Sequence, residues 1–500
     1  MTAGLLAVPL VLSGFADSPG RSSGPPAAST RPRVVDVRPR WSRPGRRVPG
    51  NPIGLSMEWP VLAGDLGPGT RPPAALADAL RALGRPALRI GGNSQDRMWP
   101  TLRGAAPGAR WAPPPRFWPA LGALARAALG RVQVGLDLSH GSAGEAAAVG
   151  SAAVAALPSG RVSFALGNEP DRYGTEHRLT LVRGRGSVAR SRPWSYSRYM
   201  RRYAAVRRGL PARAPLAGPD FAGLRWRTRL DAFLHSVRPR LATIHVYPLD
   251  ACGRRPGARG WPTPRSLLAR SSWAGEARSS IPWAAADARR HGVPLAVSET
   301  NSVACGGAPG VSDVPAAALW APAFLLSAAQ AGAQEVDFHA SGGSYDPFHV
   351  AHPPGAGAEL RPAALFDGLA FAHEALGRDP RLVAVRTVPR GAPAWALRSG
   401  DHPRVLVENL DPRRPLVASI GMPRGSTSAR VIRMTRAGRE RMAIAGRLVV
   451  DLHGHLVTTG RSVRTTLEVT SGHVRLALAP MSAAVVIAGF GRGQTRRPTS

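Results

Sequence analysis

The sequence predicts a (β/α)8 barrel of the TIM type with a C-terminal antiparallel β-sandwich domain, an α/β fold class. Three observations lead to this prediction. From about residue 50, short β-type runs alternate eight times with Ala-, Leu- and Arg-rich helical segments, as expected for strands buried in a parallel barrel. Polar side chains stand where those runs end. Past residue 376 only short β-runs separated by Gly, Pro and Asp remain, which favours a sandwich.

The eight candidate strands are near-continuous apolar runs: "PIGLSME", "ALRIGG", "VQVGLDLS", "VSFALGN", "PLAGPD", "ATIHVY", "PLAVSE" and "EVDFHAS". Helical patterns between and after them cover 74–84, 117–129, 144–156, 195–209, 264–270 with 282–290, 314–331 and 362–376. A doubly wound open sheet is the alternative for such an alternation. We expect the barrel domain to span residues 50–376.

The C-terminal β-runs are "RLVAVRTV", "AWALRS", "RVLVENL", "LVASIGM", "ARVIRMT", "RLVVDL" and "AAVVIAG". A similar run, "RVVDVRP", precedes the barrel near residue 34 and is predicted to pair back onto these strands. The expected sandwich domain therefore combines residues 34–49 with residues 377–492.

The chain begins with "MTAGLLAVPLVLSGFA", an apolar stretch too short to span a bilayer comfortably. Small residues at Gly14 and Ala16 are typical of a cleavage site, so residues 1–16 are predicted to be a secretory signal peptide. Residues 17–33 are rich in Ser, Pro and Gly and are predicted to be a disordered linker. We expect a secreted or extracellular protein without stable membrane insertion. No basic segment precedes the stretch, and a misplaced start codon is the alternative.

The formal net charge is +35, yet the chain contains no lysine, so all 66 basic residues are arginine. Complete use of arginine in place of lysine indicates GC-rich coding rather than selection for phosphate contacts. The arginines are also scattered along the sequence rather than gathered into one basic block, as a nucleic-acid site would need. We therefore predict no nucleic-acid partner, and a general affinity for acidic polymers stays open as an alternative. The missing lysine also excludes Walker A, Schiff-base and kinase chemistry. Neither a G-x-S-x-G elbow nor an H-E-x-x-H zinc motif is present.

In a (β/α)8 barrel, functional side chains gather at the C-terminal ends of the strands. Polar residues of this chain occupy those positions after all eight candidate strands. They are Glu58, Asn93, Asp96, Asp137, His140, Asn168, Glu169, Asp220, His245, Tyr247, Glu299, Asn301 and His339.

Two of these residues, Glu169 and Glu299, end the fourth and seventh strands, which face one another across the mouth of a barrel. Two carboxylates about 5–5.5 Å apart suit a retaining glycosidase, in which one is the nucleophile and the other is first acid and then base. A lone glutamate at a strand end is more commonly a cap or a surface ion pair. Two glutamates on this pair of strands favour catalysis, and Tyr247 could help to keep the nucleophile ionised.

The motif "LGNEP" on the fourth strand, with a glutamate on the seventh, resembles the signature of the clan A glycoside hydrolases. In finer detail the chain resembles family 79, which includes β-glucuronidases and heparanase-like enzymes. The resemblance extends from about residue 34 to residue 490. It rests on "IGLSMEW", "LRIGGNSQD", "FALGNEPDRYG", "IHVYP", "SETNSVACGGAPGVSD", "ALW", "VDFHASGGSYDPF" and "LAPMSAAVVI".

The resemblance implies that Glu169 is the acid/base and Glu299 the nucleophile, with no need for a metal or an organic cofactor. It implies that Asn168 hydrogen-bonds the 2-hydroxyl of the sugar, and that Glu58 and Asn93 line the subsite for the cleaved sugar. The same cleft would include His245 and Tyr247 at the end of the sixth strand.

In heparanase-like enzymes, backbone amides of a glycine-rich loop after the nucleophile hold the uronate carboxylate. The matching positions here are Ala304, Cys305 and Gly306. This chain departs from the pattern, because Ala304 replaces a tyrosine and Cys305 a glycine. The departure puts glucuronate specificity in doubt more than hydrolysis.

Several weaker candidates have structural alternatives. Asp96 is expected to cap a loop or to pair with an arginine such as Arg89. His339 is either a satisfied barrel histidine or a substrate contact. Asp171 and Tyr173 are expected to shape the loop after the fourth strand.

The only two cysteines, Cys252 and Cys305, follow the sixth and seventh strands, whose loops are neighbours on one face of a barrel. An even, minimal cysteine count in a secreted chain favours a disulfide, and two buried free thiols are the alternative.

The function expected from the sequence is a secreted retaining β-glycoside hydrolase, a β-glucuronidase that acts on glucuronic-acid-containing glycans by a two-glutamate double displacement. The alternatives are a clan A β-glycosidase for a neutral sugar, and a carbohydrate-binding protein that has lost turnover. The presence of both glutamates argues against the second alternative.

Overall fold

The computed structural model describes residues 31–43, 45–48, 50–97, 112–174, 193–400 and 402–491. The predicted signal peptide, residues 1–16, and most of the predicted linker lie outside this range. None of the helices in the described ranges is long and apolar enough to cross a membrane.

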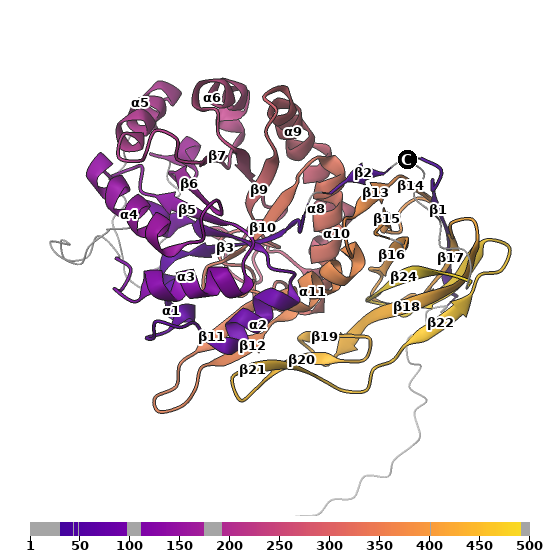
Figure 1. Ribbon diagram of the computed structural model, residues 1–500. Helices are drawn as coiled ribbons and strands as arrows, with labels where there is room; N and C mark the ends of the chain where they lie inside the picture. Colours follow the sequence, from indigo (N-terminus) through magenta and orange to yellow (C-terminus); the bar gives the residue numbers. More distant parts are fainter. Residues whose placement is uncertain are drawn as a thin grey trace, which may run out of the picture.

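Eight parallel strands close into a barrel in the order β10-β3-β4-β5-β6-β7-β8-β9 (Figure 1). This closure confirms the predicted barrel and excludes the open sheet. All eight candidate strands form, with ends shifted by a few residues. Their bounds are β3 Ile53–Glu58, β4 Ala87–Gly91, β5 Val132–Leu136, β6 Val162–Leu166, β7 Leu216–Phe221, β8 Leu241–His245, β9 Leu295–Thr300 and β10 Glu335–Ala340.

Helices surround this barrel, and every predicted helical stretch contains at least one of them. The α-helices are α1 Trp59–Leu66, α2 Ala74–Ala82, α3 Phe117–Ala128, α4 Ala143–Ala156, α5 Tyr196–Arg207, α6 Leu230–Val237, α7 Pro264–Leu267, α8 Arg270–Ala274, α9 Ser280–Arg290, α10 Pro315–Ala331 and α11 Ala364–Leu376. Short 3-10 helices are η1 Asn93–Arg97, η2 Pro170–Arg172, η3 Leu224–Arg229 and η4 Glu276–Arg278. Helices α1 and α6 were not predicted.

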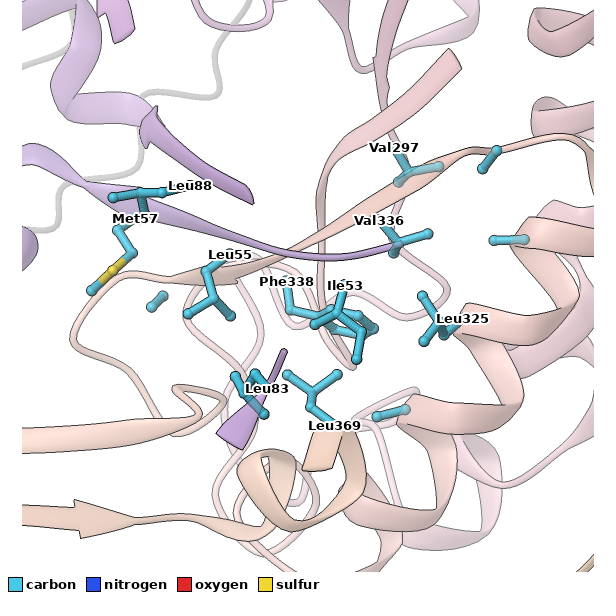
Figure 2. Close-up of a cluster of buried hydrophobic side chains, with 14 of the residues drawn as sticks. Ile53, Leu55, Met57, Leu83, Leu88, Val297, Leu325, Val336, Phe338 and Leu369 are labelled. Carbon is cyan, nitrogen blue, oxygen red and sulfur yellow. The ribbon is translucent and has the colours of Figure 1, made fainter. Parts of the chain in front are cut away.

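Alternation along each barrel strand separates the hydrophobic core from the polar interior. In β3, Ile53, Leu55 and Met57 belong to the hydrophobic cluster shown in Figure 2. Ile53 lies near Leu325 of α10 and Leu369 of α11, two helices outside the barrel, whereas Met57 lies beside Leu88 of β4. The intervening β3 residues therefore face the interior, because successive side chains of a strand point to opposite faces. This period of two places Ser56 and Glu58 of β3 on the interior side.

The sandwich consists of a four-stranded and an eight-stranded sheet. The first has the order β14-β1-β17-β23: β14 Val385–Val388, β1 Arg33–Pro39, β17 Leu416–Gly421 and β23 His473–Leu478. The second has the order β19-β18-β24-β16-β15-β13-β2, with β22 Thr465–Glu468 paired to β18: β19 Arg441–Ile444, β18 Ser426–Ala437, β24 Ser482–Phe490, β16 Arg404–Asn409, β15 Ala394–Arg398, β13 Arg381–Val383 and β2 Arg46–Arg47. Two hairpins complete the fold: β11 Phe348–Ala351 with β12 Glu359–Pro362, and β20 Leu448–Leu452 with β21 His455–Thr459.

Strand β1 joins the N-terminal segment to the sandwich, as "RVVDVRP" predicted. It pairs antiparallel with β14 but parallel with β17, so the domain is not wholly antiparallel. The long connection through the barrel between β1 and the C-terminal strands makes a parallel pairing possible.

Strands β16 and β24 of the eight-stranded sheet are buried on both faces, which ties the two domains together. In β16, Leu406 packs into the barrel core, whereas Val405 and Val407 pack into a second core between the two sheets. In β24, Val485 packs into the barrel core and Ala484 into the core between the sheets. Strands with two apolar faces read as continuous hydrophobic runs, which is why both were recognisable in the sequence.

Candidate active site

A cavity of about 570 Å³ opens at the C-terminal end of the barrel. Among the predicted strand-end residues, Glu58, Asn93, Glu169, His245, Tyr247, Glu299 and His339 line it. Asp96, Asp137, His140, Asn168, Asp220 and Asn301 do not line it. The cavity therefore brings together both predicted catalytic glutamates and most of the residues assigned to the cleaved sugar.

Glu169 follows β6 in an unusual backbone conformation, with φ +50° and ψ 52°. A left-handed backbone at a non-glycine residue costs about 1–3 kcal/mol and persists only where surrounding contacts hold it. Here the amide of Glu169 donates to the carbonyl of Asp220 (3.2 Å). The turn directs the carboxylate towards His245, whose Nδ1 lies 3.1 Å from Oε1. Nε of Arg172 lies 3.6 Å from Oε2 on the solvent side.

Glu299 lies deeper and is held by more donors. Its side chain is 8% exposed, against 17% for Glu169. Oε2 accepts a hydrogen bond from Nη1 of Arg89 (2.9 Å), and Oε1 accepts one from the hydroxyl of Tyr247 (2.9 Å). Both oxygens are thus oriented before any substrate binds, as a nucleophile requires.

A β-bulge in β9 turns Glu299 into the interior. Ile244 of β8 pairs with Val297, and His245 pairs with Glu299, so Ser298 is the extra residue. Ser298 donates to Oδ1 of Asp220 (2.6 Å) in the barrel interior, while its neighbour Glu299 reaches Arg89 there. Two consecutive residues can face the same side only where the strand is bulged.

The two glutamates are close together. One carboxylate oxygen from each, and one ring nitrogen of His245, lie within 4.8 Å of one another. In glycosidases generally, carboxyl groups about 5–5.5 Å apart suit double displacement, whereas pairs about 6.5–9.5 Å apart leave room for an attacking water.

The protonation state of Glu299 follows from its neighbours. Burial alone would raise the pKa of this carboxyl, but the charges on His339, His245 and Arg89, and the hydrogen bond from Tyr247, lower it to about 2. Glu299 is therefore a carboxylate at neutral pH, which is the form that can attack carbon.

Arg89 holds the site together and was overlooked as a functional residue in the sequence. It comes from β4, is completely buried, and contacts four side chains from four other strand ends. Its Nη1 donates to Ser56 (2.9 Å) and Glu299 (2.9 Å), and its Nη2 donates to Asn168 (2.8 Å) and Asp220 (3.3 Å). Although burial alone would lower the pKa of Arg89, the charges of Asp220 and Glu299 raise it, so the guanidinium stays charged.

Glu58 is fixed at the edge of the cavity by the loop after β4. It accepts hydrogen bonds from the amides of Asn93 (2.9 Å) and Ser94 (2.7 Å), and from the Ser94 hydroxyl. This approach needs Gly92, which has φ +75°, because a Cβ there would lie 2.4 Å from Oε1 of Glu58. Nε2 of His339 lies 3.5 Å from the same oxygen.

Asp96 caps the loop after β5 and does not pair with Arg89, so the second of the two expectations for it was wrong. Its Oδ1 accepts from the amides of Leu138 (3.0 Å) and Ser139 (3.3 Å), and its Oδ2 accepts from the hydroxyl of Tyr173 (2.5 Å). The guanidinium of Arg89 donates instead to Ser56, Glu299, Asn168 and Asp220.

Asp171 shapes the neighbouring loop, as expected. Its carboxylate accepts from the amides of Ala222 (3.1 Å) and Gly223 (2.6 Å). These bonds join the loop after β6 to the end of β7, and so stabilise the turn that carries Glu169.

The predicted carboxylate-binding loop needs one correction. The amide of Ala304 donates to the carbonyl of Leu249 (2.9 Å) and is not free for a ligand. The amides of Cys305 and Gly306 have no acceptor among the described residues, and both residues line the cavity. Their φ values of +69° and +87° place the backbone in a left-handed turn. Asn168, in contrast, is buried, and its Oδ1 is already held by Arg89.

Tyr345 and Ser341, in the loop after β10, also line the cavity and were missed. The Ser341 hydroxyl donates to that of Tyr345 (3.0 Å), which leaves the Tyr345 proton free to donate to a ligand. The carboxylate of Asp346 holds the loop by accepting from the amides of Ser341 (3.0 Å) and Gly342 (2.8 Å). The signal was present in "SGGSYD", a turn-rich stretch directly after a strand with one aromatic residue.

A metal ion fits this cluster poorly, although Glu169, His245 and Glu299 have the spacing to bind one. The guanidinium of Arg89 already supplies positive charge 2.9 Å from Glu299. Metal ligation also requires a neutral imidazole. Burial and the charge of Arg89 would lower the pKa of His245. The charge of Glu299 and the hydrogen bonds to Asp220 and Glu169 outweigh them and raise this pKa to about 9.

This raised pKa predicts a dependence of stability on pH. A histidine whose folded-state pKa exceeds its ordinary 6.5 contributes stability that is complete below pH 6.5 and lost as the pH rises through about 9. The contribution of His245 to the free energy of unfolding should fall by up to about 3 kcal/mol over that interval. Urea unfolding across this range should show the decline in the wild type and not in His245→Gln. The exposed His402→Gln is the matched control and should show the same decline as the wild type. If the free energy of unfolding of His245→Gln also falls with pH as in the wild type, His245 is not the group responsible.

Cys252 and Cys305 form a disulfide with a Cα–Cα distance of 5.3 Å, as predicted. It joins the loops after β8 and β9, and Cys305 itself lines the cavity. The bridge therefore anchors the turn of Cys305 and Gly306, which lines the cavity.

We expect the non-reduced protein to resist alkylation and to have an intact mass two hydrogens lower than the reduced form. The two cysteines are 53 positions apart, so Cys252→Ser/Cys305→Ser should lower the free energy of unfolding by up to about 4 kcal/mol. Wild-type protein kept in reductant is the control and should match the double variant. Two alkylated thiols in material purified without reductant would contradict the bridge.

Comparison with known proteins is informative at the level of structure. No protein-family model matches the chain, and no curated protein sequence matches it. A solved 4-O-α-L-rhamnosyl-β-D-glucuronidase from Fusarium oxysporum matches with a TM-score of 0.70 and 21% identity, over 91% of this chain and 99% of that one. The chain has the fold of that enzyme.

Two further solved structures show how widely the fold is shared. A family 51 arabinofuranosidase from Xanthomonas axonopodis pv. citri has a TM-score of 0.60 and 13% identity, over 91% of this chain and 100% of its own. A family 44 endoglucanase from Clostridium thermocellum has a TM-score of 0.54 and 13% identity, with the same coverage. The three differ in substrate, so the substrate of this chain has to be argued from its own residues.

Proposed function

We propose that the protein is a secreted retaining β-glycoside hydrolase that cleaves β-glucuronides. The observation that carries the hydrolase proposal is the pair of unlike carboxylates. Glu299 is buried and fixed by Arg89 and Tyr247, whereas Glu169 is more exposed and contacts His245 and Arg172. Two close carboxylates in different environments are what a double displacement uses.

In the first step a carboxylate oxygen of Glu299 attacks the anomeric carbon as the bond from that carbon to the glycosidic oxygen breaks. Glu169 gives its proton to the departing oxygen. In the second step Glu169 takes a proton from water, whose oxygen attacks the anomeric carbon and releases Glu299. His245 contacts Glu169 (3.1 Å) and lies 3.8 Å from Glu299, so its positive charge is shared by both carboxylates.

Specificity for a uronate is supported by hydrogen-bond donors that line the cavity. Among the described residues the amides of Cys305 and Gly306 have no acceptor, and the hydroxyl of Tyr345 can donate to a ligand. Carboxylates accept two or three such hydrogen bonds well. Glu58, which also lines the cavity, is an acceptor suited to sugar hydroxyls.

Aryl β-glycosides test this proposal. We expect kcat/KM for an aryl β-D-glucuronide to exceed that for the matching glucoside, galactoside and xyloside by about 100-fold, the effect of losing two hydrogen bonds to a charged group. Faster cleavage of a neutral glycoside would overturn the uronate assignment and leave hydrolysis standing. If no glycoside is cleaved, including an α-L-arabinofuranoside, the hydrolase proposal fails.

A further inference from the structure

A second cavity, of about 350 Å³, lies at the junction of the barrel and the sandwich. Helix α8 and η4 contribute Arg270 and Arg278 to its wall, and the sandwich contributes Thr387. Trp273 of α8 and Trp395 of β15 also line it and contact each other edge to face, with ring centroids 5.7 Å apart. None of the described residues lining this cavity is acidic.

Two arginines, Arg270 and Arg278, line this cavity, and Arg390 is a further positive charge that acts on Arg270, while no acidic residue is among the described lining residues. Partial burial, and then the neighbouring charges of Arg278 and Arg390, lower the pKa of Arg270. Within the described ranges none of these three side chains makes an ion pair or a hydrogen bond. On the adjacent helix α9, by comparison, Arg290 pairs with both Asp231 and Asp287. Three unopposed guanidinium groups beside a concave surface favour an anionic ligand.

The second cavity is next to the catalytic cleft, and η4 separates them. Glu276 and Ser279 line the catalytic cleft, whereas Ala277 and Arg278 line the second cavity. This division follows from the period of three in a 3-10 helix, which places residues i and i+3 on one side. A saccharide that extends out of the cleft at this end therefore reaches Arg278 after passing over the single turn of η4.

The cleft wall beside η4 has the same chemical character. Arg227 lies over the ring of Trp283, 4.9 Å from its centroid, and both residues line the cleft. A guanidinium stacked on an aromatic ring presents a positive, flat surface to a saccharide. Basic groups thus occur on both sides of η4.

We propose that the cavity at Arg270 and Arg278, with Arg390 beside it, is a second binding site for the carboxylate- or sulfate-bearing units of an anionic glycan whose reacting end occupies the cleft. The substrate class rests on the function proposed above. Guanidinium groups bind carboxylate and sulfate oxygens through paired hydrogen bonds. The cavity has the size of a small-ligand site, and its position beside the cleft favours a long substrate over an unrelated polyanion.

Calorimetric titration of the Glu299→Gln protein tests the site without turnover. The probes are a hyaluronan octasaccharide, which carries only carboxylates, and a heparin octasaccharide, which also carries sulfates. Arg270→Ala/Arg278→Ala should weaken binding of at least one probe about tenfold. The probe with the larger loss identifies the anion that the site prefers.

The matched control is Arg424→Ala/Arg475→Ala, which removes two exposed arginines from the sandwich away from the cavity, and should change affinity less than about twofold. In the otherwise native protein, Arg270→Ala/Arg278→Ala should leave kcat/KM for an aryl glycoside unchanged. The proposal fails if the two double variants bind each probe with the same affinity. So would an equal loss of affinity for a DNA duplex of the same charge. Both results are independent of turnover and so distinct from failure of the hydrolase proposal.

Discussion

Replacing Glu299 with glutamine is expected to lower kcat at least about 10⁴-fold on every substrate, because no covalent glycosyl-enzyme can form without the nucleophile. The change keeps the size of the side chain and removes the negative charge. The amide oxygen can still accept from Arg89, but the amide nitrogen only donates, so the hydroxyl of Tyr247 has to accept instead of donating. The loss should be the same for good and poor leaving groups, since the missing bond is needed in both cases. Steady-state rates on a series of aryl glycosides measure this.

Glu335→Gln is a matched control for this variant. Glu335 begins β10 at the opposite end of the barrel, has an ion pair with Arg131, and is 7% exposed, against 8% for Glu299. The control should retain activity within a few-fold, because the same chemical change is made away from the cleft. Residual activity of Glu299→Gln above about 1% of the wild type, on material free of wild-type enzyme, would show that Glu299 is not the nucleophile.

Replacing Glu169 with alanine should produce the second-largest effect, and a different pattern. Substrates whose leaving group needs a proton should be cleaved about 10²–10⁴-fold more slowly, whereas a dinitrophenyl glycoside should still form the glycosyl-enzyme rapidly. Release from Glu299 would then be slow, since no base activates water. Azide, which needs no base, should attack the anomeric carbon, displace Glu299 and restore turnover.

The product of that rescue identifies the role of Glu169. Because azide attacks the intermediate from the face that water normally uses, the product should be the β-glycosyl azide. Identical behaviour of Glu169→Ala and Glu299→Gln across leaving groups, or no response to azide, would show that the roles of the two residues are assigned wrongly.

The fold was predictable because its main signals are local. Each barrel strand is a short apolar run, and polar residues such as Glu58 and Glu299 follow where the run ends. The sandwich edges were harder to recognise. Strands such as β21 and β22 are short and half exposed, with sequences "HLVTT" and "TTLE", so they carry no hydrophobic pattern.

The polar interior of the barrel could be predicted only in part. Arg89 and Asp220 lie within runs that read as buried strands, "ALRIGG" and "PLAGPD", and both side chains are completely buried. A buried charge is tolerated where partners surround it, and those partners come from other strands far away in the sequence. Only closure of the barrel brings them together. Local indications were the period of two in β3, with Ser56 and Glu58 between apolar residues, and the same alternation in "EVDFHA" of β10.

The central claim is that Glu169 and Glu299 act by double displacement, and the stereochemistry of the first product tests it most directly. Proton NMR of an aryl β-glucuronide during early hydrolysis should show the β-anomer of the released sugar before mutarotation produces the α-anomer. This follows from carboxylate oxygens within 4.8 Å of one another, a closeness that suits double displacement rather than direct attack by water. Initial appearance of the α-anomer would mean direct attack by water and would contradict the account.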